Sequence, residues 1–175
     1  GEIIIGTQIR QDRIVDSTVL IPGYTTATIN TFCGEAFRWS SNLSSEISTS
    51  KSLYFSSGRA NSAADTNNKY IKQFRIWSEI NEKINDFNVK SFTNSVNQIY
   101  KKKKDDLEEI VNFFKIPTEA VGVAIGINNQ LVSVDVFSNT CLLQTYFPKI
   151  IRSIALDSFK KTNKKSFLNK KNVYT

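Results

Sequence analysis

With 175 residues, of which 40% are hydrophobic and 11% aromatic, the chain can bury a core of its own, and wholesale disorder is excluded. The net charge of +7 would suit binding to nucleic acid, but only 6 of the 23 basic residues are arginine. Arginine is the residue that usually reads bases and binds phosphates with two parallel hydrogen bonds, so we do not expect a nucleic-acid partner. The absence of histidine excludes catalytic Ser-His-Asp and Cys-His relays and zinc sites built on imidazole. No apolar run approaches the roughly 20 residues of a transmembrane helix.

The first part of the chain is predicted to form a pair of strands. β-Branched residues are frequent in 13–22, which ends at the turn signal Pro22-Gly23. Alternating side chains mark residues 25–33 as a second strand. Because the connection between the two is short, we expect them to pair antiparallel.

A polar stretch separates these strands from the helices. Residues 40–68 are rich in Ser, Asn and Thr and show little periodicity, which predicts a long loop. Tyr54 and Phe55 stand next to Gly58-Arg59 and could cover a site, or the whole stretch could be a disordered surface loop.

Apolar residues at helical spacing predict two helices after this loop. The first spans residues 70–87, and the second begins at an N-cap, Ser91, and continues to Phe114 as one long helix. Four consecutive lysines, 101–104, lie within the second helix and are followed by acidic residues. This pattern suits a solvated helix face with i,i+4 ion pairs, and a polyanion-binding patch is the alternative.

A hairpin and a final helix complete the predicted elements. Residues 120–137 read as two strands joined at Asn128-Asn129, which can adopt positive φ in a tight turn. Ser138 or Asn139 can cap the final helix. Pro148 lies inside that helix and should kink it, because proline lacks a backbone donor.

The order of the elements indicates the fold class. Hairpins joined by helices predict an α+β fold, in which antiparallel β-hairpins pack with two long amphipathic helices and a proline-kinked C-terminal helix. We expect residues 1–160 to form a single α+β domain. Residues 161–175, which are rich in Lys and Asn, are expected to be a basic flexible tail.

Two segments, residues 10–13 and 33–40, concentrate polar groups that are costly to bury alone. If the segments meet in space, they form either a ligand site or a structural polar cluster. In a ligand site, Arg13 and Arg38 would hold a phosphate or carboxylate, because a guanidinium binds such anions with two parallel hydrogen bonds.

Other residues of these segments would support the ligand. Glu35 and Asp12 would hold its hydroxyls, act as a general base or coordinate a divalent cation, and they are the candidate catalytic residues. Gln11 would orient the ligand, and Trp39 would stack on a base or sugar. Cys33 could act as a nucleophile only if nearby arginines stabilise its thiolate, because the chain has no histidine.

In the structural alternative, Arg13 or Arg38 pairs with Glu35, the amide of Gln11 closes a strand end, and Trp39 fills the core. Breaking a buried ion pair costs about 3–5 kcal/mol, which is reason enough for such residues to be retained.

The two cysteines, Cys33 and Cys141, are too few for a structural zinc site of the usual type, and we expect no metal site. They are either buried free thiols or one disulfide, since the sequence does not give their separation. No signal peptide is in view, so cytoplasmic, periplasmic and secreted locations all stay open.

The motifs also occur in a familiar order. Gln11-Asp12-Arg13 and the segment Cys-Gly-Glu-Ala-Phe-Arg-Trp at 33–39 resemble the Gln-Asn/Asp-Arg and Cys-x-Glu-x-x-Arg-Trp motifs of the "ARG and Rhodanese-Phosphatase-superfamily-associated protein" domain family, a mainly bacterial group of unknown function. The resemblance extends from about Gln11 to about Phe159. It is also carried by Val19-Leu20-Ile21-Pro22, Trp77, Val121-Gly122-Val123, Val134-Asp135-Val136-Phe137, residues 147–153 and Ala155-Leu156-Asp157.

The resemblance has consequences for function. Family members usually carry an additional segment before the first motif, so we expect a fragment or a short variant here. The family name records association with ADP-ribosylglycohydrolase and rhodanese-phosphatase proteins. This association implies a phosphorylated nucleotide or ADP-ribose-like ligand, although association with other proteins does not establish function. The alternative is a non-catalytic interaction or assembly subunit of a larger envelope or secreted complex, with a protein partner. The residues do not decide whether a reaction is catalysed or whether a cofactor is used.

Overall fold

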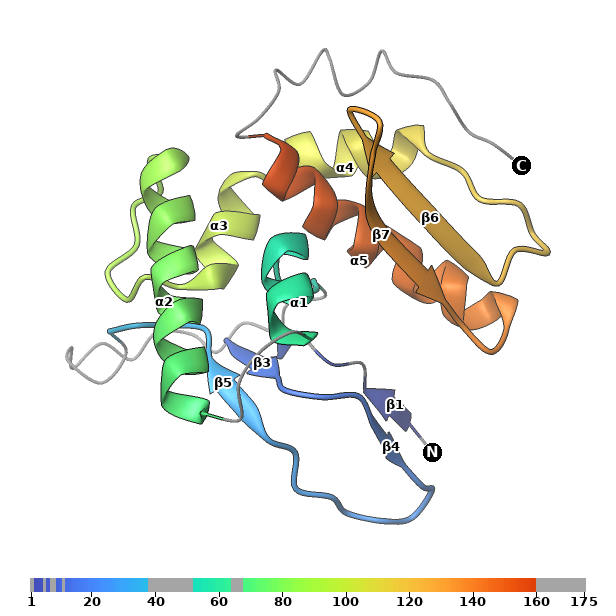
Figure 1. Cartoon of the computed structure of the whole chain (residues 1–175), viewed down its shortest axis with the longest axis horizontal. Coiled ribbons are helices and arrows are strands. Elements are labelled where there is room, and N and C mark those ends of the chain that lie inside the picture. The colour runs from blue at the N-terminus through green and yellow to red at the C-terminus, as the bar shows by residue number, and fades with distance from the viewer. Residues whose placement is uncertain are drawn as a thin grey trace. The chain divides into compact units, whose positions relative to one another are not determined.

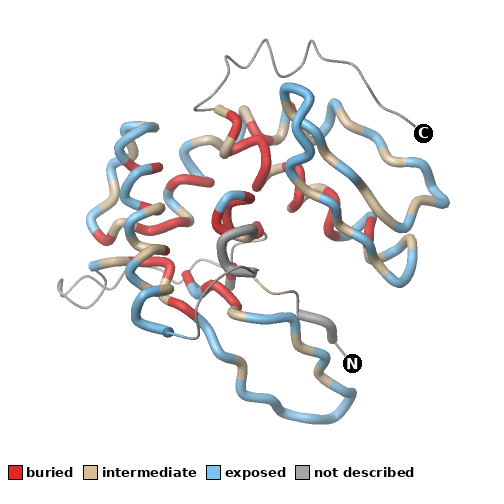
Figure 2. The backbone as a smooth tube through the Cα atoms, in the orientation of Figure 1, coloured by how far each residue is buried: buried red, intermediate tan, exposed pale blue. Residues whose placement is uncertain are grey.

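The computed structural model describes residues 2–4, 6, 9–10, 12–37, 52–63 and 68–159. The chain gathers into two compact units, Gly1–Lys103 and Lys104–Thr175 (Figure 1). Buried residues occur in both units (Figure 2). The single domain expected over residues 1–160 stays a prediction, and the tail expected at 161–175 lies outside the described residues.

The first unit contains two small antiparallel sheets. In one of them, β1 (Glu2–Ile4) pairs with β4 (Val19–Ile21). In the other, β3 (Arg13–Val15) lies between β2 (Ile9–Arg10) and β5 (Thr31–Cys33). The antiparallel pairing of β3 with β5 is the one that the sequence predicts.

The strand predicted over residues 13–22 is interrupted at Asp16 and Ser17, which form a bend between β3 and β4. Asp and Ser favour such bends because their short polar side chains compete for backbone hydrogen bonds. The amide of Asp16 still donates to the carbonyl oxygen of Asn30 at 3.0 Å. Beyond the bend, residues 19–21 pair with β1, and residues 25–30 form no strand. The predicted hairpin of residues 13–22 with 25–33 is therefore correct only where β3 pairs with β5 and is wrong for the rest of both segments.

The loop predicted over residues 40–68 contains buried chain and a helix. Residues 53–55 are at most 2% exposed, and α1 (Ser56–Ala63) follows them. The loop prediction is therefore wrong for residues 52–63, whereas 38–51 and 64–67 lie outside the described residues. The helix has a Ser- and Gly-rich sequence of weak helix propensity, so packing on buried neighbours must stabilise it.

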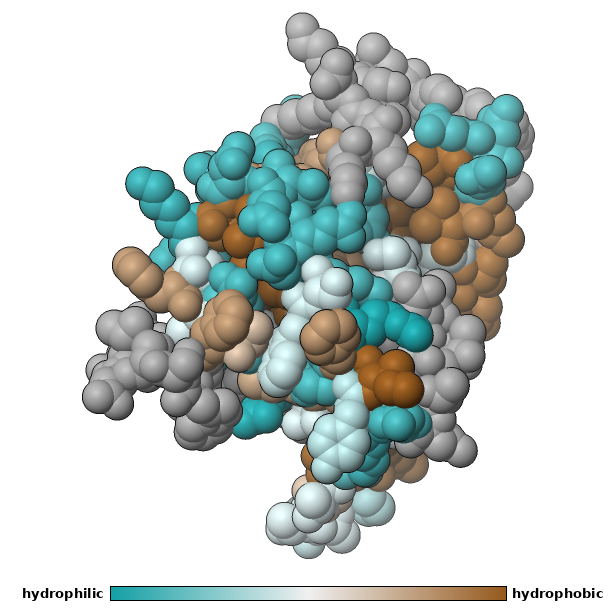
Figure 3. Space-filling view, turned by 60° about the vertical axis from the view of Figure 1, so that its left-hand side comes forward, coloured by the Kyte–Doolittle hydropathy of each residue, from teal (hydrophilic) through white to brown (hydrophobic). Residues whose placement is uncertain are grey.

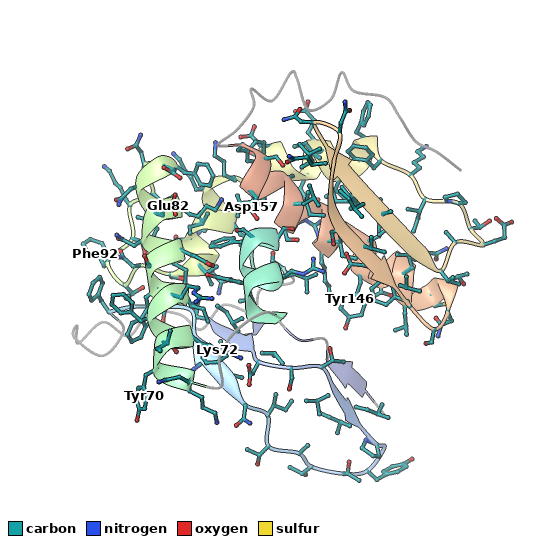
Figure 4. All side chains as sticks on the ribbon, in the orientation of Figure 1. Tyr70, Lys72, Glu82, Phe92, Tyr146 and Asp157 are labelled. Atoms are coloured by element: carbon teal, nitrogen blue, oxygen red, sulfur yellow. The ribbon has the colours of Figure 1, made fainter. Side chains whose placement is uncertain are left out.

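Helix α2 (Lys69–Asp86) forms where apolar spacing predicts it. Asn68 caps its start, with the side-chain oxygen accepting from the amides of Tyr70 at 3.0 Å and Ile71 at 3.3 Å. Tyr70 is exposed and points away from the helix (Figure 4). The buried residues recur at helical spacing along one face: Ile76, Ile80, Lys83 and Ile84.

The second predicted helix is two helices, α3 (Val96–Lys102) and α4 (Lys104–Phe113). The N-cap of α3 is Ser95 and not Ser91. Phe92, which was expected on the apolar face, precedes the helix and is 89% exposed.

The order of charges explains the break at Lys103. Lys101 and Lys102 lie in the last turn of α3, and Asp105 and Asp106 lie in the first turn of α4. The helix dipole favours cations at a C-terminus and anions at an N-terminus. A basic run followed by an acidic run therefore suits one helix end followed by a new helix start.

The second unit contains the predicted hairpin and final helix. Strands β6 (Gly122–Ile127) and β7 (Gln130–Val136) are joined by Asn128 and Asn129, whose φ values of 52° and 63° confirm the predicted positive-φ turn. Helix α5 (Thr140–Ser158) continues through Pro148. It begins at Asn139, whose side chain accepts from the amide of Leu142 at 2.9 Å, so one of the two predicted caps is confirmed.

Two contacts tie the elements of this unit together. The ring of Phe137, just after β7, stacks on Tyr146 of α5 with centroids 5.7 Å apart and planes at 9°; Figure 4 labels Tyr146. The guanidinium of Arg152 on α5 donates to both carboxylate oxygens of Glu108 on α4, each at 2.9 Å. The apolar core beneath is formed by side chains of α4 and α5, among them Leu107, Ile110, Leu143, Ile150 and Ile154.

The architecture is α+β, as the sequence predicts, with small antiparallel sheets beside helices. None of the described helices is long and apolar enough to cross a membrane. Both cysteines are free thiols, Cys33 half-buried and Cys141 exposed.

Candidate ligand site beside strands β3 and β5

The two polar segments singled out in the sequence lie side by side. Arg13 on β3 is the register partner of Cys33 on β5, and the amide of Gly34 donates to the carbonyl oxygen of Asp12 at 2.7 Å. The next row of the sheet, Ile14 opposite Phe32, is buried and anchors both strands in the core. The core therefore holds the polar ends of both strands in a fixed register.

Asp12 occupies the turn between β2 and β3 with a left-handed backbone, φ 56°, which aspartate tolerates better than most residues. It is 4% exposed. Its Oδ1 atom accepts a hydrogen bond from the hydroxyl of Ser95 at 2.7 Å and another from the side-chain amide of Asn97. A buried carboxylate needs such donors, and here they come from a segment more than 80 residues further along the chain.

Glu35 is the second buried carboxylate, at 3% exposure. Its Oε1 atom accepts from the hydroxyl of Thr93 at 3.0 Å, and its backbone forms an isolated antiparallel bridge with Ser95. On either side of this bridge, the amide of Val96 donates to the carbonyl oxygen of Gly34 at 3.0 Å, and the amide of Phe37 donates to the carbonyl oxygen of Thr93 at 3.1 Å. Residues 93–96 thus run beside the second polar segment like a short extra strand.

Ser95 links this segment to helix α3. Its Oγ atom accepts from the amide of Asn97 at 3.1 Å, which is the N-cap bond of the helix, and donates to Asp12. One hydroxyl therefore starts a helix and satisfies a buried carboxylate. The amide of Ser95 donates in turn to the Oγ atom of Ser91 at 3.0 Å, so the residue expected as the cap supports the actual cap.

Helix α2 closes the outer edge of β5 at Cys33. The side-chain amide of Gln73 accepts from the Cys33 amide at 2.7 Å and donates to its carbonyl oxygen at 2.9 Å. The indole Nε1 of Trp77 donates to the same carbonyl at 3.1 Å. The Cys33 thiol donates to the carbonyl oxygen of Glu35 at 3.0 Å, so the side chain of the suggested nucleophile is tied into the backbone.

Of the predicted ligand residues, the structure brings Asp12, Arg13 and Glu35 together at the ends of β3 and β5. Gln11, Arg38 and Trp39 lie outside the described residues, and their roles stay predictions. Arg13 is exposed, and no carboxylate in the described part of the chain lies within ion-pair distance of it. The structural alternative that pairs Arg13 with Glu35 is therefore not what the described residues adopt.

Sequence reasoning missed the partners of these carboxylates: Thr93, Ser95, Asn97 and Gln73. One signal was available, because Thr93-Asn94-Ser95 is a cluster of N-cap residues directly before the apolar spacing of α3. Nothing in the sequence pointed to Gln73, an ordinary polar residue on a helix.

The carboxylates of the two polar segments have partners within the protein. Among the residues with described positions, no group of three or more Cys, Asp and Glu side chains is placed to hold a metal ion. Both carboxylates already accept hydrogen bonds from protein hydroxyls or amides, which suits them to position the strands. The exposed cation beside them is Arg13.

Comparison with known proteins identifies a family. The model of the ARG and Rhodanese-Phosphatase-superfamily-associated Protein domain matches residues 1–173, nearly the whole chain. No curated protein matches the chain, and no solved structure does.

Proposed function

We propose that this chain, which belongs to the ARG and Rhodanese-Phosphatase-superfamily-associated Protein domain family, binds a small anionic ligand through Arg13. The ligand class is a phosphorylated nucleotide or an ADP-ribose-like compound. The observation that carries the proposal is the exposed Arg13 guanidinium, for which the described residues supply no ion-pair partner, in a strand held by a buried polar network. Gln11, Glu35, Arg38 and Trp39 complete the proposed ligand set.

The sheet supports an anion next to Arg13. Arg13 lies in the central strand of its sheet, with Arg10 and Cys33 as its backbone register partners on β2 and β5. A phosphate matches the planar guanidinium, which offers two parallel donors.

Asn97 provides a second supporting observation. While its amide nitrogen donates to Asp12, its Oδ1 atom is buried and has no hydrogen-bond partner among the described residues. A buried oxygen without a donor is costly, and an explanation is a water or ligand hydroxyl that supplies one. Ribose hydroxyls are donors of this kind. In this proposal Asp12, which accepts hydrogen bonds from Ser95 and Asn97, is a positioning residue that holds the strand ends.

The test is a thermal-shift and calorimetric titration of the full chain with inorganic phosphate, ADP and ADP-ribose. A ligand at 100 times its Kd stabilises the folded state by about 2.7 kcal/mol, which raises the Tm by several degrees. We expect ADP or ADP-ribose to raise the Tm and Arg13→Ala to weaken that ligand by about 10- to 100-fold, the loss expected for hydrogen bonds to a charged group. Arg13→Lys should recover only part of the affinity, because lysine lacks the planar fork.

The matched control is Lys102→Ala, which removes the same charge from an exposed position on α3. It should leave the affinity unchanged. The proposal fails if no compound shifts the Tm at millimolar concentration, or if Lys102→Ala weakens binding as much as Arg13→Ala, since the effect would then reflect net charge.

A non-catalytic assembly subunit is the second candidate, and a different observation favours it. The β6–β7 hairpin exposes an apolar face, with Val134 58% and Val136 73% exposed. This candidate requires no small ligand, so the two functions can be tested separately.

A further inference from the structure

The β6–β7 hairpin exposes the face that its sequence would bury. Along β7, Val132, Val134 and Val136 are exposed, whereas Ser133 and Asp135 between them are half-buried. Alternation of apolar with polar residues predicts the exposed face for Asp135, and the structure has the reverse. Figure 3 shows hydrophobic side chains, in brown, gathered on the right of the view over the hairpin.

The hairpin also lacks neighbours at its edges. In the part of the chain that is described, β6 and β7 form a two-stranded sheet, and none of their residues is buried. An isolated two-stranded hairpin is marginally stable, and natural edge strands carry Lys, Pro or short lengths that block pairing. Strand β7 is seven residues long and contains neither Lys nor Pro. A bulge interrupts its pairing with β6 at Val132, so the regular part of the edge is residues 133–136.

The hydrogen-bond pattern identifies which groups face outward from β7. The amide of Phe137 donates to the carbonyl of Val121 at 2.8 Å, so residues 137, 135 and 133 bond to the neighbouring strand. The backbone groups of Val134 and Val136 must then point to the outer edge. The same valines expose their side chains, so the open edge and the apolar face belong to one segment.

We propose that β7 pairs with β7 of a second copy of this chain, antiparallel about a two-fold axis at Val134. In this register Val134 faces Val134 of the second copy, each Asp135 faces Ser133, and Val136 lies opposite the bulged Val132. The result is a four-stranded sheet with a continuous valine face, and a two-fold contact of this kind is self-complementary. The inference rests on the assembly candidate and is independent of anion binding at Arg13.

Charge complementarity on the other face of the sheet selects this register. With the axis at Val134, each Asp135 faces Ser133 of the second copy, and the two carboxylates do not oppose each other. Within one chain the Ser133 hydroxyl already donates to Asp135, so each carboxylate keeps this partner in the proposed dimer. A register centred on Asp135 would place like charges directly opposite, which is destabilising.

The first experiment is sedimentation equilibrium of the full chain at about 100 μM, which is 100-fold above a micromolar Kd. We expect the mass of a dimer, and we expect Val134→Lys to give a monomer with an unchanged far-UV CD spectrum. The matched control is Leu20→Lys on β4, an apolar strand residue that is 67% exposed, which should remain a dimer. Arg13→Ala should also remain a dimer, which separates this inference from the ligand proposal.

The second experiment tests the register without depending on the folding of the lysine variant. In a Cys141→Ser background, Val134→Cys should cross-link with a short bismaleimide, because directly opposed residues of a hydrogen-bonded pair have Cα atoms about 5.5 Å apart. Val136→Cys is more exposed, yet its two copies would be about 14 Å apart along the strands and should not cross-link. A monomeric wild-type chain, or equal cross-linking of both cysteine variants, would overturn the proposal.

Discussion

Gln73 bonds through its side-chain amide to both backbone polar groups of Cys33, accepting from the N–H at 2.7 Å and donating to the C=O at 2.9 Å. These are the two groups that a neighbouring strand would use. The helix therefore supplies, with one side chain, the hydrogen bonds that the edge of β5 would otherwise take from water.

Replacing Gln73 by Leu should destabilise the first unit. The change removes the hydrogen-bond acceptor of the backbone N–H of the half-buried Cys33 and one of the donors to its carbonyl oxygen. The free energy of unfolding should fall by about 1–3 kcal/mol. Urea unfolding of the full chain, followed by CD, measures this difference. Gln98→Leu, at an exposed position of α3, is the matched control and should change the free energy by less than about 0.5 kcal/mol. Equal stability of the two variants would show that water replaces the Gln73 amide without cost.

Gly34→Ala should be destabilising because of a close approach and not because of backbone strain. A Cβ atom at this position would lie 2.9 Å from the carbonyl oxygen of Asp12 and 2.9 Å from Cγ1 of Val96. Overpacking of this kind costs typically about 1–3 kcal/mol. Urea unfolding measures the cost.

The chain offers a glycine control for this prediction. At Gly126, also in an extended segment, an added Cβ atom would be 3.4 Å from its nearest neighbour, the carbonyl oxygen of Gln130. Gly126→Ala should be tolerated within about 0.5 kcal/mol. If Gly34→Ala is equally tolerated, then Asp12 and Val96 can move apart and the polar network is looser than its distances indicate.

The pair Arg152–Glu108 should contribute modestly to stability and in a salt-dependent manner. Its geometry is bidentate, but the side chains are 21% and 41% exposed, so solvent screens the attraction. A double-mutant cycle with Arg152→Ala and Glu108→Ala should give a coupling energy of about 0.5–1 kcal/mol. In 1 M NaCl the coupling should fall, since the Debye length shortens to about 3 Å. A coupling that is unchanged by salt would mean that packing and not charge joins the two helices.

Local chemistry made several elements predictable. Positive φ at Asn128-Asn129 fixes the hairpin turn, and the side chain of Asn139 fixes the start of α5, since both effects act within three residues. The sequence also predicts the pairing of β3 with β5, but it does so from a short turn at Pro22-Gly23, whereas residues 16–30, including β4, connect the two strands.

Other features depended on groups that are distant in the sequence. The run at Lys101–Lys104 was read as one exposed helix face, although the helix dipole gives a second meaning to the same order of charges. The helix α1 has a sequence of low propensity, and it directly follows the buried Tyr54 and Phe55. In the candidate site, Asp12 and Arg13 could be named from their residue types, but the donors Ser95 and Asn97 could not.

The bond between Asp12 and Ser95 spans 83 positions of sequence. During synthesis, the ribosome releases both strands of the candidate site long before it releases the hydroxyl that joins them. The entropy of closing so long a loop must be met before the contact forms, so we expect the site to be one of the last features of its unit to assemble. A nascent chain that ends at residue 60 would therefore carry the recognisable motifs of the family without yet holding them in place.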